Sequence, residues 1–335
     1  MAMRRSSPTE DTSAEPAAVS IRRAGDWLHE GRQHDRAGRI EDAVQCYQEA
    51  IGGATPHDSA VRAESMRRLG VIFHLRADTA RAQRMCQASR DLAIEIGDNL
   101  LAAEAINTLA GLEFEAGEIA AARAGFNRAI ALASAYPALV ARAEQNLGVL
   151  ATIQGDLDDA LQHYQRSLDA SRAANDELGC AITYHNLGMV SSDRRMWDDA
   201  DGYFKRSLAI AQRLDDVHLQ GLCLLNHSEV HIARQRYDEA RTSAEAALSI
   251  FDRLGARLDK ADTYTVLGVV FRETGRTALA ESRFRAAIDL ALQSGSILSE
   301  AEASRELARL YQDMGRNQDA LRLLNVSHRL FARLD

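Results

Sequence analysis

The stretch "YHNLGMV" at residues 184–190 returns in altered form as "EQNLGVL" at residues 144–150 and as "LLNHSEV" at residues 224–230. Self-similarity at a fixed period of about 40 residues is typical of repeat proteins, in which one helical unit stacks on the next. Aligned on the position after the Asn, the chain divides into eight units. Their anchor residues are Glu30, Leu69, Leu109, Leu147, Leu187, His227, Leu267 and Leu307.

Small side chains recur in phase with these anchors. An Ala stands thirteen residues after every anchor, at Ala43, Ala82, Ala122, Ala160, Ala200, Ala240, Ala280 and Ala320. Twenty residues after the anchor the residue is Ala or Ser, at Ala50, Ser89, Ala129, Ser167, Ser207, Ala247, Ala287 and Ser327. Small residues at fixed helical positions let two helix axes approach closely. Each unit is therefore expected to be a pair of packed helices.

Aromatic and glycine positions complete the pattern. Five units carry an aromatic residue seventeen positions after the anchor, at Tyr47, Phe126, Tyr164, Phe204 and Phe284. Five units carry a Gly eight positions after it, at Gly38, Gly117, Gly155, Gly275 and Gly315. Gly adopts the left-handed conformation at low cost, so this position predicts the end of the first helix of each pair.

The composition agrees with an almost entirely helical, soluble chain. Of 335 residues 46 % are hydrophobic, 5 % are aromatic and only four are Pro. The net charge of −8 is spread along the chain, which argues against nucleic-acid binding and against a basic membrane patch. Four scattered cysteines without a CxxC pair favour a reducing compartment. Lys205 and Lys260 are the only lysines among 40 basic residues, which indicates a GC-rich bacterial genome.

The ends of the chain add two expectations. Residues 1–19 are polar and lack the apolar core of a signal peptide, so we expect a disordered lead-in. No run of about 18 apolar residues occurs, so no membrane span is expected and the location should be cytoplasmic.

The columns resemble the tetratricopeptide repeat, whose signature has Leu-Gly, then Tyr, Gly, Ala, Phe and Ala. The period is longer than the usual 34 residues, and so resembles the long-helix subclass of kinesin light chains and bacterial peptide-sensing regulators. The resemblance implies an all-α fold, a right-handed superhelical solenoid of about eight helix hairpins over residues 20–335. The expected repeats are 24–59, 60–99, 100–138, 139–178, 179–219, 220–258, 259–299 and 300–335.

Three Asn residues in phase, Asn146, Asn186 and Asn226, precede the anchors of successive repeats. In the family that the repeats resemble, this position points into the concave groove. An Asn side chain offers a donor and an acceptor, which match one peptide group of an extended chain. The resemblance thus implies an amide ladder that grips a peptide or protein partner. The alternative is that each amide bonds to the adjacent repeat and only fixes packing.

Residues four and one before each Asn, and three after it, share its helix face and should give the groove selectivity. The candidates are Arg142, Gln145, Val149, Ile182, His185, Met189 and Glu229. Two Arg clusters are candidates for charged groove ends that pair with acidic groups of a ligand. They are Arg67 and Arg68 upstream, and Arg272, Arg305 and Arg309 downstream. The alternative for these arginines is pairing along their own helices.

Motifs of catalysis are missing from the sequence: there is no phosphate-binding loop, dinucleotide fingerprint, zinc-protease motif or nucleophile elbow. "HSEVH" places His227 and His231 one turn apart, but both fall on columns that are apolar in other repeats. We therefore expect no catalytic residue, no metal or other cofactor, and a protein that is not an enzyme.

The C-terminal helix carries an apolar stripe of Leu323, Val326, Leu330 and Phe331, with no following repeat in the sequence. This stripe would either form a homodimer or contact the next domain of a longer bacterial signalling protein, whose output is an enzyme or a transcription regulator. A structural scaffold that only dimerises is the remaining alternative.

Overall fold

The computed structural model describes residues 22–333, so the expected lead-in at residues 1–19 lies outside the described part. Within it the chain forms helices joined by short turns and no strand, which confirms the all-α prediction. The helices are α1 (Ala24–Arg36), α2 (Ile40–Gly52), α3 (Ser59–Leu75), α4 (Thr79–Glu95), α5 (Asn99–Glu115), α6 (Ile119–Leu132), α7 (Pro137–Ile153), α8 (Leu157–Ala173), α9 (Glu177–Asp193), α10 (Trp197–Arg213), α11 (Val217–Ala233), α12 (Tyr237–Leu254), α13 (Arg257–Glu273), α14 (Thr277–Ser294), α15 (Ile297–Asp313) and α16 (Asn317–Phe331).

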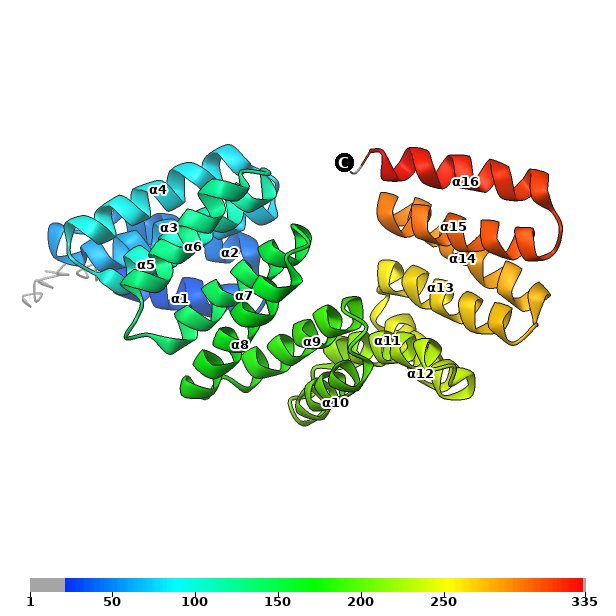
Figure 1. Cartoon of the computed structure of the whole chain (residues 1–335). Coiled ribbons are helices and arrows are strands. Elements are labelled where there is room, and N and C mark those ends of the chain that lie inside the picture. Colours follow the sequence, from blue (N-terminus) through cyan, green and yellow to red (C-terminus); the bar gives the residue numbers. More distant parts are fainter. Residues whose placement is uncertain (1–21, 334–335) are drawn as a thin grey trace, which may run out of the picture. The chain divides into compact units, whose positions relative to one another are not determined.

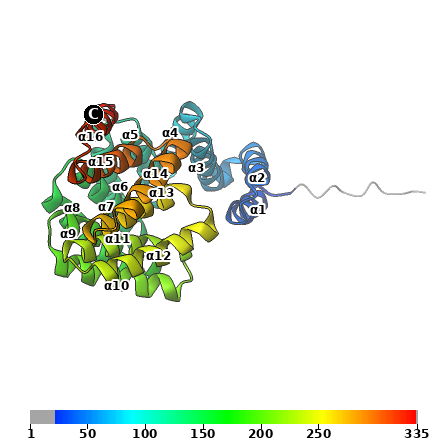
Figure 2. The ribbon, with the colours of Figure 1, turned by 90° about the vertical axis from the view of Figure 1, so that its right-hand side faces the viewer.

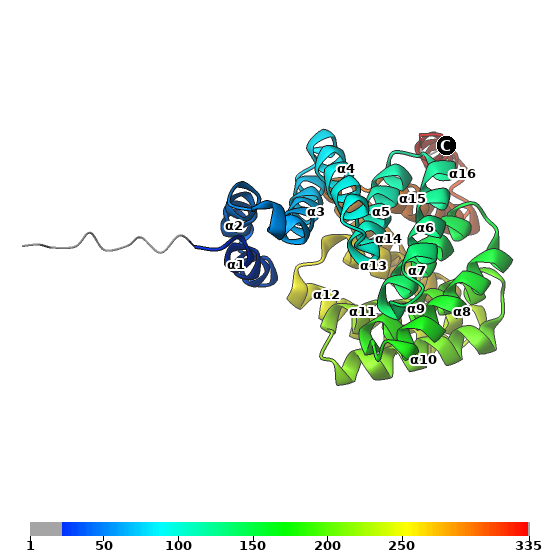
Figure 3. The same cartoon turned by 90° about the vertical axis from the view of Figure 1, so that its left-hand side faces the viewer.

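The helices belong to two compact units. The first unit covers residues 1–105 and holds the hairpins α1/α2 and α3/α4, which Figure 3 shows as two antiparallel pairs. The second unit covers residues 106–335 and runs from the end of α5 to α16. Within this second unit the hairpins from α7/α8 to α15/α16 follow one another in chain order (Figures 1 and 2). No helix of the described residues has the length and apolar character that a membrane span requires.

The small-residue columns lie where helices touch, as predicted. All eight Ala residues of the first column are at most 1 % exposed. The Gly after the anchor packs under the aromatic ring of the same hairpin: a Cβ on Gly148 would fall 2.6 Å from Cε1 of Tyr164, and one on Gly268 would fall 2.5 Å from Cε1 of Phe284. In these two hairpins the ring therefore leaves no room for a Cβ at the Gly position.

Ser residues of the second small column also make a hydrogen bond that recurs along the chain. Each donates its hydroxyl to the backbone carbonyl of an Ala on the first helix of its hairpin. The pairs are Ser89 to Ala63 at 2.7 Å, Ser167 to Ala141 at 2.9 Å, Ser207 to Ala181 at 2.8 Å and Ser327 to Ala301 at 2.8 Å. These buried hydroxyls are satisfied within the hairpin, so they fix how its two helices pack.

The turn position is left-handed, which confirms the prediction for the five glycines. Their φ angles lie between 70° and 78°. Three repeats hold the same conformation without Gly: Ala77 has φ 57°, and Arg195 and Gln235 have φ 59°. A Cβ in this region costs free energy, so these three turns are strained.

Helices at the first position of each hairpin form the concave side of the second unit. Successive first helices, α7, α9, α11, α13 and α15, contact one another directly. The second helices contact chiefly their own partner and the first helix of the next hairpin. The first helices are therefore closer together than the second helices, and the stack curves around them.

Candidate functional site

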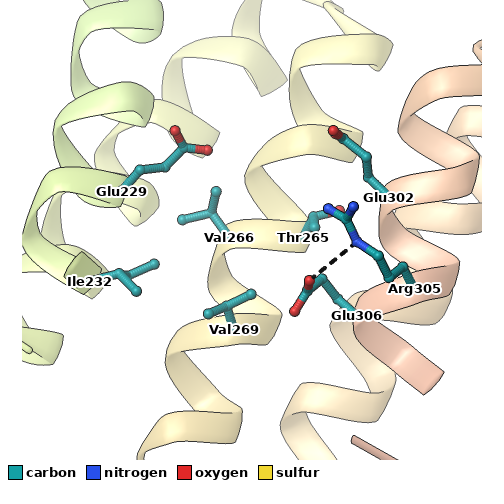
Figure 4. A pocket seen from close by; sticks show the side chains of 8 residues that line it. All are labelled: Glu229, Ile232, Thr265, Val266, Val269, Glu302, Arg305 and Glu306. Atoms are coloured by element: carbon teal, nitrogen blue, oxygen red, sulfur yellow. Dashed lines mark ion pairs between the residues drawn. The ribbon is translucent and has the colours of Figure 1, made fainter. Parts of the chain in front are cut away.

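A cavity of about 260 Å³ lies on the concave side of the second unit, between α11, α13 and α15 (Figure 4). Its walls consist of Glu229, Ile232, Thr265, Val266, Val269, Glu302, Arg305 and Glu306. Val266 and Glu306 occupy the position before the anchor, the same column that carries Asn in the three preceding repeats. That column therefore faces the cavity in the last two repeats.

Both acidic and apolar side chains line the cavity. Glu229 on α11 and Glu302 on α15 stand on opposite sides, with Val266 of α13 between them (Figure 4). Ile232 of α11 and Val269 of α13 form an apolar surface one turn further along their helices. The arrangement combines hydrophobic contact area with polar groups that can orient a ligand.

Glu306 forms ion pairs with all three members of the downstream Arg cluster. Its carboxylate lies 2.7 Å from Nη1 of Arg272 and 2.7 Å from Nη1 of Arg309, and 3.8 Å from Nε of Arg305. Arg305 also lies over the ring of Phe331, 5.5 Å from its centroid. The three arginines expected at a charged groove end are thus held by groups of the chain itself.

Glu229 has no such basic partner. Enclosure by the groove, together with the charges of Glu302, Asp262 and Asp193, raises the pKa of its carboxyl to about 7. The side chain still has solvent-accessible surface. It is therefore surrounded by the walls of a concave surface while remaining open to a ligand.

The other three acids share this environment. Burial raises the pKa of Glu302, which nearby Arg305 opposes, and burial also raises the pKa of Asp193. Burial raises the pKa of Asp262 as well, opposed by a hydrogen bond with the Ser299 side chain. Four successive first helices, α9, α11, α13 and α15, thus contribute one acid each to this face.

The three Asn residues of the sequence pattern are all half-buried on α7, α9 and α11. Asn226 Nδ2 lies 2.9 Å from Nε2 of His185, so one amide is bonded to the preceding repeat. Asn186 also interacts with the ring of His185, and this hydrogen bond opposes the lowering of the His pKa by burial. The Asn146 amide has no hydrogen-bond partner among the residues that the structure describes.

The neighbours predicted to give selectivity differ in exposure. Arg142, Met189 and Glu229 are exposed, whereas Gln145, Val149 and Ile182 are half-buried. His185 is 8 % exposed and is occupied by its hydrogen bond with Asn226. The face around the Asn column is thus a mixture of accessible polar and apolar groups.

The upstream Arg pair lies in the first unit and is engaged there. Glu64, 3 % exposed, accepts from Nε of Arg67 at 2.9 Å and from Nε of Arg68 at 2.6 Å. Arg67 also pairs with Glu104 at 3.1 Å, and Arg68 pairs with Asp35 at 3.3 Å. These charges stabilise α3 against its neighbours.

The C-terminal stripe is only partly accessible. Leu330 is 8 % exposed and belongs to the core, whereas Leu323, Val326 and Phe331 are half-buried. Leu323 packs against the apolar core of the last three repeats.

Among the described residues one group has ligand atoms close enough for a metal ion, Glu30, His34 and Cys46 in the first unit. The guanidinium of Arg22 pairs with Glu30, and Nε of Arg39 donates to Nδ1 of His34 at 2.8 Å. Two positive groups already occupy this cluster, which disfavours a cation there.

Several cavity residues were not among the predicted site residues. Val266 and Glu306 could have been found by following the Asn column into repeats whose residue there is different. Ile232 and Glu302 gave no signal in the sequence, because an isolated apolar or acidic residue on a helix has no distinctive pattern.

The fold and the concave cavity define an all-α array of helix hairpins with a binding surface on its first helices. Residues 139–213 and 222–293 match the tetratricopeptide repeat family. The matched residues therefore form tetratricopeptide repeats. No curated protein matches the chain in sequence.

Solved structures share this fold at low sequence identity. The apo form of the quorum sensor NprR from B. thuringiensis is 17 % identical, with a TM-score of 0.71 over 92 % of this chain and 87 % of that one. Aspartyl phosphate phosphatase F from Bacillus subtilis is 12 % identical, with a TM-score of 0.68 over 94 % and 96 %. A Rap protein complexed with competence and sporulation factor is 14 % identical, with a TM-score of 0.66 over 92 % and 87 %.

Proposed function

We propose that this protein is an interaction scaffold that binds an extended peptide or protein segment along the concave face of its second unit. The observation that carries the proposal is the cavity between α11, α13 and α15, because the column that precedes each anchor lines it. On α7, α9 and α11 the same column holds Asn146, Asn186 and Asn226, and α11 is also one wall of the cavity. Repetition of the hairpin extends one surface through all five repeats.

The amides suit the backbone of an extended ligand. The Asn146 side chain is half-buried, without a partner among the described residues, so its donor and acceptor can both serve a peptide group. Asn226 uses one donor on His185 and keeps its carbonyl oxygen for a ligand. The proposed selectivity comes from the flanking residues Arg142, Gln145, Val149, Ile182, Met189 and Glu229.

Two of the similar structures support recognition as a role of such an array, while a third carries the name of a phosphatase. One is described as a quorum sensor, and the other as a Rap protein in complex with a factor. On this proposal the chain acts by binding, either alone or as the sensory part of a longer signalling protein.

Selection of linear peptides on the immobilised full chain tests the proposal. Peptides enriched from a random library would be titrated by fluorescence anisotropy against wild type and against an Asn146→Ala/Asn186→Ala/Asn226→Ala variant. One net hydrogen bond is worth about 1 kcal/mol, so losing two or three should weaken binding about 30- to 150-fold.

The matched control is Asn127→Ala, which removes an exposed amide on the second helix α6 that bonds only to the Arg123 carbonyl. This variant should bind as wild type does. Enriched peptides that bind the triple Asn variant with unchanged affinity would contradict the ladder.

A further inference from the structure

We infer that the cavity between α11, α13 and α15 receives a positively charged side chain, arginine or lysine, of the bound peptide. The inference rests on the proposed function, since it names the chemistry of one residue of the same ligand. Its basis is the unbalanced negative charge of an open cavity, together with the apolar wall beside it.

Glu229 is the centre of this charge. No hydrogen bond or ion pair reaches its carboxylate from any described residue, and the charges that act on it come from Glu302, Asp262 and Asp193. An acid that is enclosed among other acids gains most from a cation that enters from solution. A guanidinium or ammonium group would supply the missing positive charge.

Glu302 supplies the second carboxylate from the opposite side of the cavity (Figure 4). It forms no ion pair within the described chain, although Arg305 lies one turn further along α15. The Arg305 guanidinium pairs with Glu306 and lies over the ring of Phe331. The charge of Arg305 also lowers the pKa of Glu302, whereas no basic side chain of the described residues acts on Glu229, so Glu229 is the acid without a counter-charge.

The apolar wall fits the rest of a long basic side chain. Ile232, Val266 and Val269 lie beside the acids, and the aliphatic stem of Arg or Lys covers such surfaces while its charged end reaches polar groups. Pockets for whole small molecules usually occupy about 300–1,000 Å³. The cavity of about 260 Å³ is smaller, as expected for a subsite that holds one side chain of a longer ligand.

Spacing of the carboxylates argues against a metal ion at the same place. Among the described residues the only group with three ligand atoms within 4.8 Å of one another is Glu30, His34 and Cys46. No three acids of the cavity therefore lie close enough together to hold one small ion. A planar guanidinium with five donors can bridge carboxylates that are more widely separated.

The test uses the random peptide library on the full chain. Wild type should enrich peptides with Arg or Lys at one position, and a Glu229→Gln/Glu302→Gln variant should lose that preference while still enriching peptides. The matched control Glu239→Gln, an exposed acid at the start of the second helix α12, should keep the basic preference.

A selected peptide then gives the quantitative test. Replacing its arginine by citrulline, which keeps the shape and removes the charge, should weaken binding to wild type about tenfold, the factor that 1.4 kcal/mol produces. The same replacement should have no effect on the double Gln variant, whose folding is checked by circular dichroism.

Three outcomes decide the matter. A basic preference that disappears in the double Gln variant supports the inference. Peptides that bind wild type without any basic preference, or whose citrulline forms bind as well, overturn it while the proposed function stands. If no peptide is enriched at all, the proposed function fails and the inference fails with it.

Discussion

The Nδ2 atom of Asn226 lies 2.9 Å from the Nε2 atom of His185, so an amide of α11 donates a hydrogen bond to an imidazole of α9. His185 is buried, and burial lowers the pKa of its ring. A neutral ring keeps the lone pair on Nε2 that accepts this bond. The interaction ties two successive repeats together on the face proposed to bind a ligand.

Acidification should break this tie. A His pKa that is lowered in the folded state contributes stability above pH 6.5, and this stability is lost as the pH falls through the folded-state value. We expect wild type to lose stability below pH 6.5 more steeply than His185→Gln, which carries the residue of the preceding repeat. Thermal unfolding by circular dichroism from pH 8 to pH 5 measures the difference. The exposed His328→Gln is the control, and equal slopes for all three proteins would contradict the prediction.

Glu229→Gln should show the opposite dependence on pH. Because the pKa of Glu229 is raised to about 7, the folded state holds its proton more tightly than the unfolded state does. Wild type therefore loses stability as the pH rises from about 4.5 to 7. Over this pH range the stability of the variant should rise relative to that of wild type. Above pH 7 the difference in stability should stay constant. Since solvent screens an exposed carboxylate, the gain is on the order of 1 kcal/mol or less, or about 2 °C in Tm. Identical Tm values at pH 8 would contradict it.

Gly188→Ala should destabilise the fifth hairpin. The new Cβ would fall 2.5 Å from Cε1 and 2.7 Å from Cδ1 of Phe204, a ring that is 1 % exposed and cannot move away. Overpacking of this kind costs about 1–3 kcal/mol. Gly202→Ala on α10 is the matched control: its Cβ would meet nothing within 4 Å, and Ala should stabilise the helix by about 1 kcal/mol. Urea unfolding separates the two, and equal midpoints would refute the packing argument.

Gln235→Gly should stabilise the protein. Gln235 occupies the left-handed turn position with φ 59°, where four repeats of the second unit have Gly. Relief of the Cβ strain, about 1–2 kcal/mol, exceeds the entropy that Gly adds to the unfolded chain, so a net gain of about 0.5–1 kcal/mol is expected. The reciprocal change Gly275→Ala, at φ 73°, should lower the free energy of unfolding by about 1 kcal/mol. A lower urea midpoint for Gln235→Gly would show that the turn is not strained.

The fold could be predicted from the sequence because each hairpin needs the same small and aromatic residues at the same positions, about 40 residues apart. Gly148 and Tyr164 illustrate it: the ring needs a residue without a side chain beneath it, so both positions recur in other units. The sequence also predicts the left-handed turn wherever Gly occupies the turn position. It does not predict the turn at Arg195, because residues other than Gly adopt this conformation only when the hairpin constrains them.

The candidate site could be predicted only in part. Asn146 was recognisable because its column repeats. The hydrogen bond between Asn226 and His185 joins residues 41 positions apart in the chain, so no local sequence pattern predicts it. The acids Glu229 and Glu302 belong to different columns, so only the curvature of the array brings them to one cavity. For the downstream arginines the sequence leaves open a charged groove end or pairing along their own helices; Arg309 pairs with Glu306 of its own helix, whereas Arg272 reaches Glu306 from α13, which no local pattern predicts.

Photo-crosslinking gives the most direct test of the claim that the concave face binds the peptide. A benzophenone amino acid would replace Val269, which lines the cavity, or Ala246, which is exposed on the second helix α12. With a peptide selected on wild type, we predict crosslinks from position 269 and none from position 246. Crosslinks from position 246 alone would place the ligand on the outer face and contradict the account.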